Sequence, residues 1–181
     1  MDGMGEQTLE RPTLSTARLW LRPLEADDAP QLARLANNYD VAKMTGSFPH
    51  PYALIDAQAL IAKARACNPA REAWFAITVP GEGPIGTMAF MAGDGPWPEA
   101  GYWIGEPHWG KGYASEMLKG AMNWVRHDWG KRCVVAGHFA DNDASGVVLC
   151  KAGFLYTGVV EMHHSKARGH EAPSRQMVWL A

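Results

Sequence analysis

Two glycines separated by one residue, Gly110 and Gly112, constrain the fold of this chain more than any other feature. They lie in the run WGKGYA, residues 109–114, after a strand-like run at residues 100–104 and before a long amphipathic helix. Glycine allows a tight turn and the close approach of another molecule. The helix that follows presents free N–H groups and the positive end of its dipole, which favours a phosphate. The alternative is a strand-to-helix turn that requires glycine and binds nothing.

The spacing of these glycines excludes two common phosphate-binding classes. A nucleoside triphosphatase needs GxxxxGK[ST] and a dinucleotide-binding fold needs GxGxxG, and neither pattern is present in this segment. The net charge of −2 over 181 residues also argues against a general nucleic-acid binder. We therefore expect no nucleic-acid partner.

The sequence predicts a cytoplasmic protein that does not contact a membrane. No apolar run approaches the ~18 residues of a membrane-spanning helix, and the N-terminal residues lack the apolar core of a secretory signal. The three cysteines, Cys67, Cys133 and Cys150, are odd in number and widely spaced, which favours reduced thiols over a disulfide framework.

The order of predicted elements indicates one mixed α/β (α+β) domain over residues 14–181, preceded by a flexible N-terminus at residues 1–13. A first helix begins at Asp27 or Asp28, which is expected to cap it. Residues 45–52 and 163–174 are expected to be loops. The other predicted helices cover residues 56–67, 114–130 and 141–152, and strands cover residues 18–22, 74–79, 85–91, 100–104, 133–139, 154–162 and 176–180.

The glycine-containing run resembles the pyrophosphate loop of the GNAT superfamily of acyl-CoA N-acyltransferases, [QR]xxGx[GA]. Here it reads Trp109-x-x-Gly112-x-Ala114, and Trp109 departs from the usual Gln or Arg. That departure is common in the RimJ/RimL-like branch, which includes ribosomal-protein N-terminal acetyltransferases. Three further segments match the branch in the expected order: TARLWLRP at residues 16–23, EAGYWI at residues 99–104, and Asn142-x-x-Ser145 followed by KAGF at residues 151–154.

This resemblance implies the GNAT fold and acetyl-CoA as co-substrate. The fold is one mixed, mostly antiparallel sheet of about seven strands flanked by about four helices. In it, strand 100–104 splays from strand 133–139 and leaves room for the pantetheine arm. Asn142 and Ser145 also fit a second role, as the cap and first turn of a helix, and Lys151 fits a solvated helix face. The residues implied in cofactor binding are Trp103, Ile104, Gly105, Gly110, Lys111, Gly112, Tyr113, Ala114, Ser115, Asn142, Ser145 and Lys151.

The resemblance implies direct acetyl transfer to a primary amine, which needs a base for the amine and a proton for the leaving thiolate. Glu99, at the start of the splayed strand, is the candidate base, acting through water; the alternative is a surface carboxylate beside a turn. Many relatives use a tyrosine of the last helix as the acid, and Leu149 occupies that position here. Ser145 or a water then serves as acid, or the thiolate leaves unassisted.

Other features leave the acceptor open. His163, His164 and His170 fit no common zinc spacing, so no metal is expected and a solvated loop beside the acceptor pocket is predicted. The acceptor is a protein or peptide N-terminus or a small amine. Because relatives are often dimers, a homodimer is one expected assembly. The missing tyrosine also sustains a second hypothesis, a non-catalytic acyl-CoA-binding or sensor domain.

Overall fold

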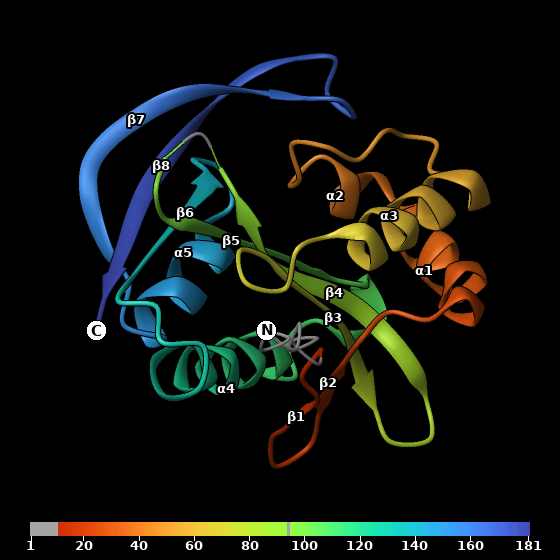
Figure 1. Ribbon diagram of the computed structural model, residues 1–181. Coiled ribbons are helices and arrows are strands. Elements are labelled where there is room, and N and C mark those ends of the chain that lie inside the picture. Colours follow the sequence, from red (N-terminus) through yellow and green to blue (C-terminus); the bar gives the residue numbers. More distant parts are fainter. Residues whose placement is uncertain (1–10, 94) are drawn as a thin grey trace, which may run out of the picture.

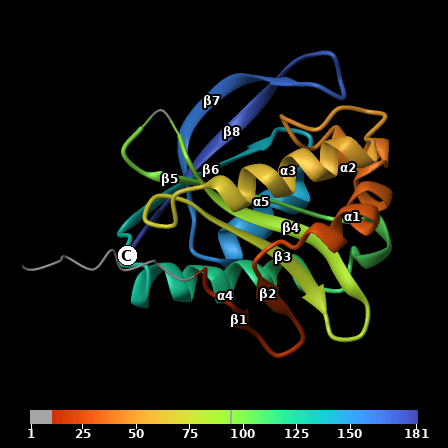
Figure 2. The same cartoon turned by 45° about the vertical axis from the view of Figure 1, so that its right-hand side comes forward.

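The computed structural model describes residues 11–93 and 95–181, which build one eight-stranded sheet with helices on both faces (Figures 1 and 2). The strand order is β1-β2-β3-β4-β5-β6-β8-β7, and only β5 and β6 run parallel. The strands are β1 (Leu14–Ser15), β2 (Trp20–Arg22), β3 (Ala73–Val79), β4 (Gly83–Ala92), β5 (Pro98–Ile104), β6 (Cys133–Phe139), β7 (Leu155–Ser165) and β8 (His170–Leu180). The α-helices are α1 (Ala29–Ala36), α2 (Tyr39–Ala42), α3 (Leu54–Ala66), α4 (Tyr113–His127) and α5 (Asp143–Lys151).

The parallel strands β5 and β6 separate soon after they meet. Only Glu99 and Ala100 of β5 have partners in β6, opposite Val135 and Ala136. Both strands continue beyond these pairs, so the sheet opens into a V between them. The splay implied by the resemblance is therefore present in the structure.

Each face of the sheet has its own hydrophobic core. Helices α4 and α5 cover one face, and α1 and α3 cover the other (Figure 2). Because successive side chains of a strand point to opposite faces, neighbouring residues of β5 enter different cores. Trp103 packs in the core under α1 and α3, whereas Tyr102 and Ile104 belong to the core under α4 and α5.

The first helix begins where the sequence indicates, but Asp28 does not cap it through its side chain. Asp28 occupies the N-cap position of α1 without a side-chain cap hydrogen bond. Its buried carboxylate instead accepts two hydrogen bonds from Arg22, at 2.7 and 2.8 Å. A buried carboxylate needs a charged partner, and the adjacent strand β2 supplies it.

The prediction of a polar loop over residues 163–174 is wrong. Strand β7 runs to Ser165 and β8 starts at His170, so only residues 166–169 form a turn. Because β7 is an edge strand and nearly all of it is exposed, it does not need the alternation of apolar and polar side chains that marks a strand in sequence. The single-turn helix α2 and the two-residue strand β1 were also not anticipated, so the sheet has eight strands rather than about seven.

Two further predictions concern the N-terminal residues and contact with a membrane. The expected flexibility of residues 1–13 falls largely on residues 1–10, which lie outside the described residues. In the described part of the chain, no helix combines the length and apolar character that crossing a membrane requires.

Candidate active site

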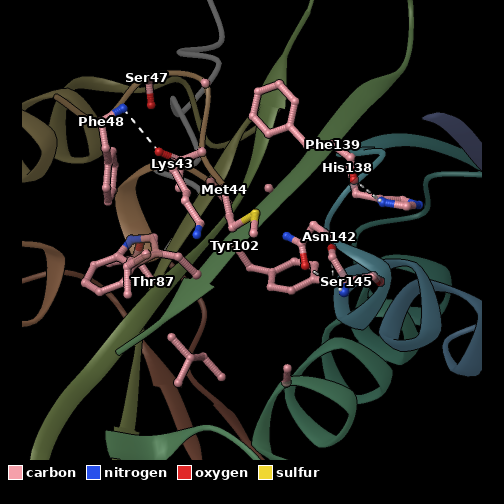
Figure 3. A pocket seen from close by; sticks show the side chains of 18 of the residues that line it. Lys43, Met44, Ser47, Phe48, Thr87, Tyr102, His138, Phe139, Asn142 and Ser145 are labelled. Carbon is pink, nitrogen blue, oxygen red and sulfur yellow. Dashed lines mark hydrogen bonds between the residues drawn. The ribbon is translucent and has the colours of Figure 1, made fainter. Parts of the chain in front are cut away.

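A cleft of about 1710 Å³ passes through the V between β5 and β6. Its walls come from four regions: the β5 strand with the turn that follows it, the start of α4, the β6–α5 segment, and the segment from α2 to α3 together with the β7–β8 hairpin. Figure 3 shows Tyr102 beside Ser145 on one wall of the cleft and Lys43, Met44 and Phe48 on another. The cleft therefore brings together segments from both halves of the sequence.

The turn at residues 109–112 ends at the start of α4. Gly110 and Gly112 have φ angles of +73° and +79°, in the left-handed region that residues with a Cβ rarely adopt. Gly112 is the N-cap of α4, and both glycines line the cleft. The first N–H groups of an α-helix have no partners within the helix, so this end of the cleft offers backbone donors and a positive helix dipole.

Trp109, which departs from the Gln or Arg of the family motif, fixes this turn to β5. Its indole Nε1 donates a hydrogen bond of 2.6 Å to the Ile104 carbonyl. The indole thus holds the turn against the last residue of the strand, at the open side of the V.

The structure brings most of the predicted cofactor residues together on the cleft wall and leaves three outside it. The Gly105 amide donates to the Ile85 carbonyl at 2.8 Å, and a Cβ on Gly105 would lie 2.8 Å from Leu35 Cδ2, so this glycine serves the packing of α1 on the sheet. Lys111 and Lys151 have exposed side chains and do not line the cleft. The predicted cofactor residues that do line it are Trp103, Ile104, Gly110, Gly112, Tyr113, Ala114, Ser115, Asn142 and Ser145.

Ser145, a predicted catalytic residue, faces a tyrosine that the sequence did not single out. The hydroxyls of Tyr102 and Ser145 are 2.9 Å apart across the V. Burial raises the pKa of Tyr102 to about 12, and the hydrogen bond with Ser145 lowers it by less, so the phenol is protonated at neutral pH. Asn142 accepts a hydrogen bond from the Ser145 amide at 3.2 Å, which confirms its capping role. Leu149 is buried in the core beneath.

Glu99, the predicted base, lines the cleft at the apex of the V. Strand alternation places its side chain on the same face as Trp103 and on the opposite face from Tyr102. Tyr102 is three positions after Glu99, which corresponds to roughly 10 Å along β5. The Tyr102–Ser145 pair and the Glu99 carboxylate therefore reach the cleft from opposite faces of the sheet.

On the Glu99 face, the tip of the β7–β8 hairpin is joined to the segment that follows α2 (Figure 1). Lys166 N donates to the Gly46 carbonyl at 3.1 Å. Arg168 Nε donates to the Lys43 carbonyl at 2.8 Å, and its guanidinium binds both oxygens of Asp141 at 2.8 and 3.0 Å. We call the contacts of Arg168 with Lys43 and Asp141 the Arg168 clasp; they join two residues that line the cleft, Lys43 and Asp141.

The histidines of the hairpin belong partly to the cleft. His163 and His164 line it, whereas His170 does not, and their place beside an acceptor pocket stays a prediction. His163 contacts the Glu161 carboxylate at 3.2 Å. Within the described residues, no group of three or more His, Cys, Asp or Glu side chains is arranged to hold a metal ion.

His138, a buried residue of β6 that lines the cleft, was not among the candidates that the sequence indicated. Its Nε2 is 2.9 Å from the Tyr156 hydroxyl and its Nδ1 is 2.9 Å from the Phe139 carbonyl. No local pattern marks it, because β6 reads as an apolar strand and its partner comes from β7.

Comparison with known proteins identifies the family to which this cleft belongs. Residues 18–155 match the sequence profile of the family described as "Acetyltransferase (GNAT) domain", which is more than half of the chain. The chain belongs to the GNAT acetyltransferase family. This GNAT chain is also 29% identical over 160 residues to the uncharacterized N-acetyltransferase YoaA of Bacillus subtilis (strain 168), covering 84% of this chain and 88% of YoaA.

Solved structures share the fold of this GNAT chain. Mycobacterium smegmatis RimJ in complex with CoA-disulfide has a TM-score of 0.80 and 19% identity, covering 94% of this chain and 88% of RimJ. The microcin C7 self-immunity acetyltransferase MccE in complex with acetyl-CoA and AMP has a TM-score of 0.76 and 18% identity, covering 91% of this chain and 93% of MccE. The GNAT fold predicted from the motifs is confirmed, and RimJ comes from the branch that the sequence resembles.

Proposed function

We propose that this GNAT protein transfers an acetyl group directly from acetyl-CoA to a primary amine, either a small amine or a peptide or protein N-terminus. The observation that carries this proposal is the V between β5 and β6. It has a glycine turn and helix N-terminus at one end and the Tyr102–Ser145 pair in its wall, with Glu99 reaching it from the other face. RimJ and MccE were solved with CoA-disulfide and with acetyl-CoA, which supports the same co-substrate here.

The backbone of β5 provides a place for the pantetheine arm. In an antiparallel pair, alternate residues direct their N–H and C=O groups toward the partner strand. Because Gly105 N–H bonds Ile85 of β4, the backbone groups of Tyr102 and Ile104 face the opposite way, into the V. The Ile104 carbonyl accepts the hydrogen bond from Trp109. This leaves the Tyr102 carbonyl and the Ile104 N–H to pair with the amides of the arm, as an added strand would, and the Tyr102 N–H to face the thioester.

The pyrophosphate of the co-substrate fits the other end of the same path. The amides of residues 110–115 surround the start of α4, where the helix dipole favours an anion. The predicted contacts of Lys111 and Lys151 with phosphate would need these exposed side chains to swing toward the ligand. We therefore propose that the backbone, rather than these lysines, carries most of the phosphate binding.

The reaction then uses both faces of the sheet. The neutral amine attacks the thioester carbon on the Glu99 face, its proton passes through water to Glu99, and the C–S bond breaks as the amide forms. A backbone N–H near Ile104 that faces the V polarises the thioester carbonyl. The leaving thiolate takes a proton from Ser145 while the protonated Tyr102, hydrogen-bonded to that hydroxyl, passes its own proton to Ser145, and solvent then restores the Tyr102 proton. This pair fills the role of the tyrosine that Leu149 replaces.

Leu149 also favours a second candidate function, a non-catalytic acyl-CoA-binding or sensor domain. Both functions require CoA to bind in the V, and only the first requires turnover. The Tyr102–Ser145 pair supports catalysis, because it supplies a hydroxyl where the usual acid is missing.

The experiment combines purified protein, acetyl-CoA and a set of amines, with thiol release as the readout. The set contains peptides with free N-termini, spermidine, amino acids and aminoglycosides. We expect release with at least one amine, and Glu99→Gln lowers kcat by about a hundredfold or more without raising KM for acetyl-CoA. Tyr102→Phe and Ser145→Ala lower kcat by smaller factors, and the exposed Glu171→Gln is the matched control. CoA binding without thiol release on any amine would favour the sensor.

A further inference from the structure

The β1–β2 turn, far from α4 in the sequence, reaches the glycine turn through Arg18. The Arg18 guanidinium donates from Nη1 to the Lys111 carbonyl at 3.0 Å and lies 4.8 Å from the centre of the Tyr113 ring. Its Nε donates to Glu116 Oε2 at 2.7 Å, and its backbone N–H donates to Glu116 Oε1 at 2.7 Å. One side chain thus contacts both the glycine turn and the first turn of α4.

The partner of Arg18 is itself held in place. Glu116 Oε1 also accepts a hydrogen bond of 2.6 Å from the Thr16 hydroxyl. Burial raises the pKa of the Glu116 carboxyl, but the hydrogen bonds from Thr16 and Arg18 outweigh burial and the net shift is downward. Thr16 packs so closely on α4 that its Cγ2 lies 2.8 Å from where a Cβ on Gly120 would be. The turn is therefore fixed to the helix at several points.

Arg18 approaches the glycine turn from outside the cleft. Gly110, Gly112 and Tyr113 line the cleft, whereas Arg18 and Lys111 do not. The Lys111 carbonyl and the Gly112 N–H belong to one planar trans peptide group, so they point in opposite directions. When Arg18 holds the carbonyl on the outer side, the Gly112 N–H is directed away from Arg18, toward the cleft.

We propose that Arg18 is a positioning residue for the pyrophosphate of CoA: it fixes the Lys111–Gly112 peptide so that the Gly112 amide faces the phosphates. This inference rests on the proposed function, because it requires CoA to bind along the glycine turn. The segment TARLWLRP, residues 16–23, would then have a role in cofactor binding in addition to its place in the sheet. Two glycines make the turn flexible, and the guanidinium removes that freedom at the peptide that matters for binding.

The test compares intact CoA with its two halves. S-acetylpantetheine carries the thioester without the pyrophosphate, and 3′-phospho-ADP carries the pyrophosphate without the arm. We expect Arg18→Ala to raise the Kd for CoA and for 3′-phospho-ADP, measured by calorimetry, by about tenfold. The same variant changes kcat/KM for S-acetylpantetheine by less than about twofold, because no group that this half contacts has moved.

Two further variants separate orientation from charge and from general loss of stability. Arg18→Lys keeps a cation beside Glu116 but lacks the planar fork that spans Glu116 and the Lys111 carbonyl, so it binds CoA as weakly as Arg18→Ala. Arg126→Ala removes a cation from the opposite end of α4, where Arg126 lies over Trp179, and it leaves CoA binding unchanged. Urea unfolding confirms that each variant is folded.

Three results would overturn the inference. Arg18→Ala could bind CoA with wild-type affinity, Arg18→Lys could restore wild-type affinity for CoA, or Arg18→Ala could lower kcat/KM for S-acetylpantetheine by as large a factor as it weakens CoA binding. Failure of the wild type to bind CoA would overturn the proposed function together with this inference, and is thereby distinguished from failure of Arg18 alone.

Discussion

The two sides of the cleft are built in different ways. The side proposed for the co-substrate consists mainly of contiguous chain: the end of β5, the glycine turn and the start of α4 follow one another in sequence, and only Asn142 and Ser145 come from a separate segment. The opposite side joins the segment after α2 to the β7–β8 hairpin through the Arg168 clasp, across more than a hundred residues. Backbone geometry sets the first side, and a few long-range side-chain contacts set the second. The first side therefore suits a ligand common to a family, and the second can change its acceptor without disturbing the first.

The largest expected effect comes from breaking the co-substrate side alone. Gly112→Asp places a Cβ at φ +79°, 3.5 Å from Arg18 Nη2, so it strains the glycine turn and adds a negative charge to it, and the affinity for CoA falls by about a hundredfold or more. Gly81→Asp is the matched control: Gly81 has φ +84° in the β3–β4 turn and nothing within 4 Å of its Cβ position. Calorimetry with both variants decides the point, and unchanged affinity in folded Gly112→Asp would refute this placement of the site.

A smaller effect is expected from breaking the acceptor side alone. Arg168→Ala removes the hydrogen bonds to Lys43 and Asp141, so the hairpin tip loses its main attachment. We expect KM for the amine to rise by about tenfold while the Kd for CoA changes by less than about threefold. Steady-state kinetics with an amine found in the thiol-release assay measures the KM, and calorimetry measures the Kd for CoA.

The matched control for this variant is Arg175→Ala, whose guanidinium lies 3.9 Å from Asp143 and makes no part of the clasp. If Arg168→Ala weakened CoA and amine equally, the two sides would not be separate units.

The smallest effect is a pH dependence of the clasp. The hydrogen bond from Arg168 holds the pKa of Asp141 below its ordinary value of 3.8, against the opposing effect of burial. A carboxyl whose pKa is depressed in the folded state stabilises that state above its unfolded pKa, and the stabilisation disappears as pH falls through the folded pKa. The difference in unfolding free energy between wild type and Arg168→Ala is therefore constant from pH 7 to 5 and shrinks below about pH 4. Urea unfolding at several pH values tests this, and a difference that does not vary with pH would contradict it.

The difference between the two sides also explains what the sequence could predict. The residues of the glycine turn and of Asn142–Ser145 are adjacent or three apart, so a motif marks them and their local geometry follows. Tyr102 was missed as a partner of Ser145 because only the splay of β5 from β6 brings it to α5. Arg18 was missed because its contacts lie 93 and 98 residues away.

The hairpin shows the limit most clearly. Residues 163–174 are rich in polar side chains, and a polar run predicts a loop. They form strands because the backbone ladder between β7 and β8 continues, with His163 opposite Ala172 and His164 opposite Glu171. Strand pairing depends on two segments, and the polarity of the side chains indicates it only where one face of the sheet is buried. The edge strand β7 is exposed, so its polar side chains do not indicate that it is paired.

A crystal structure of the complex with CoA tests the central claim most directly. The account predicts that the pantetheine arm lies between β5 and β6, with its amides paired to the backbone of Tyr102 and Ile104. It also predicts that the pyrophosphate lies within hydrogen-bond distance of the amides of residues 110–115, and that the sulfur lies beside Ser145. CoA bound outside the V, or phosphates held away from the glycine turn, would contradict it.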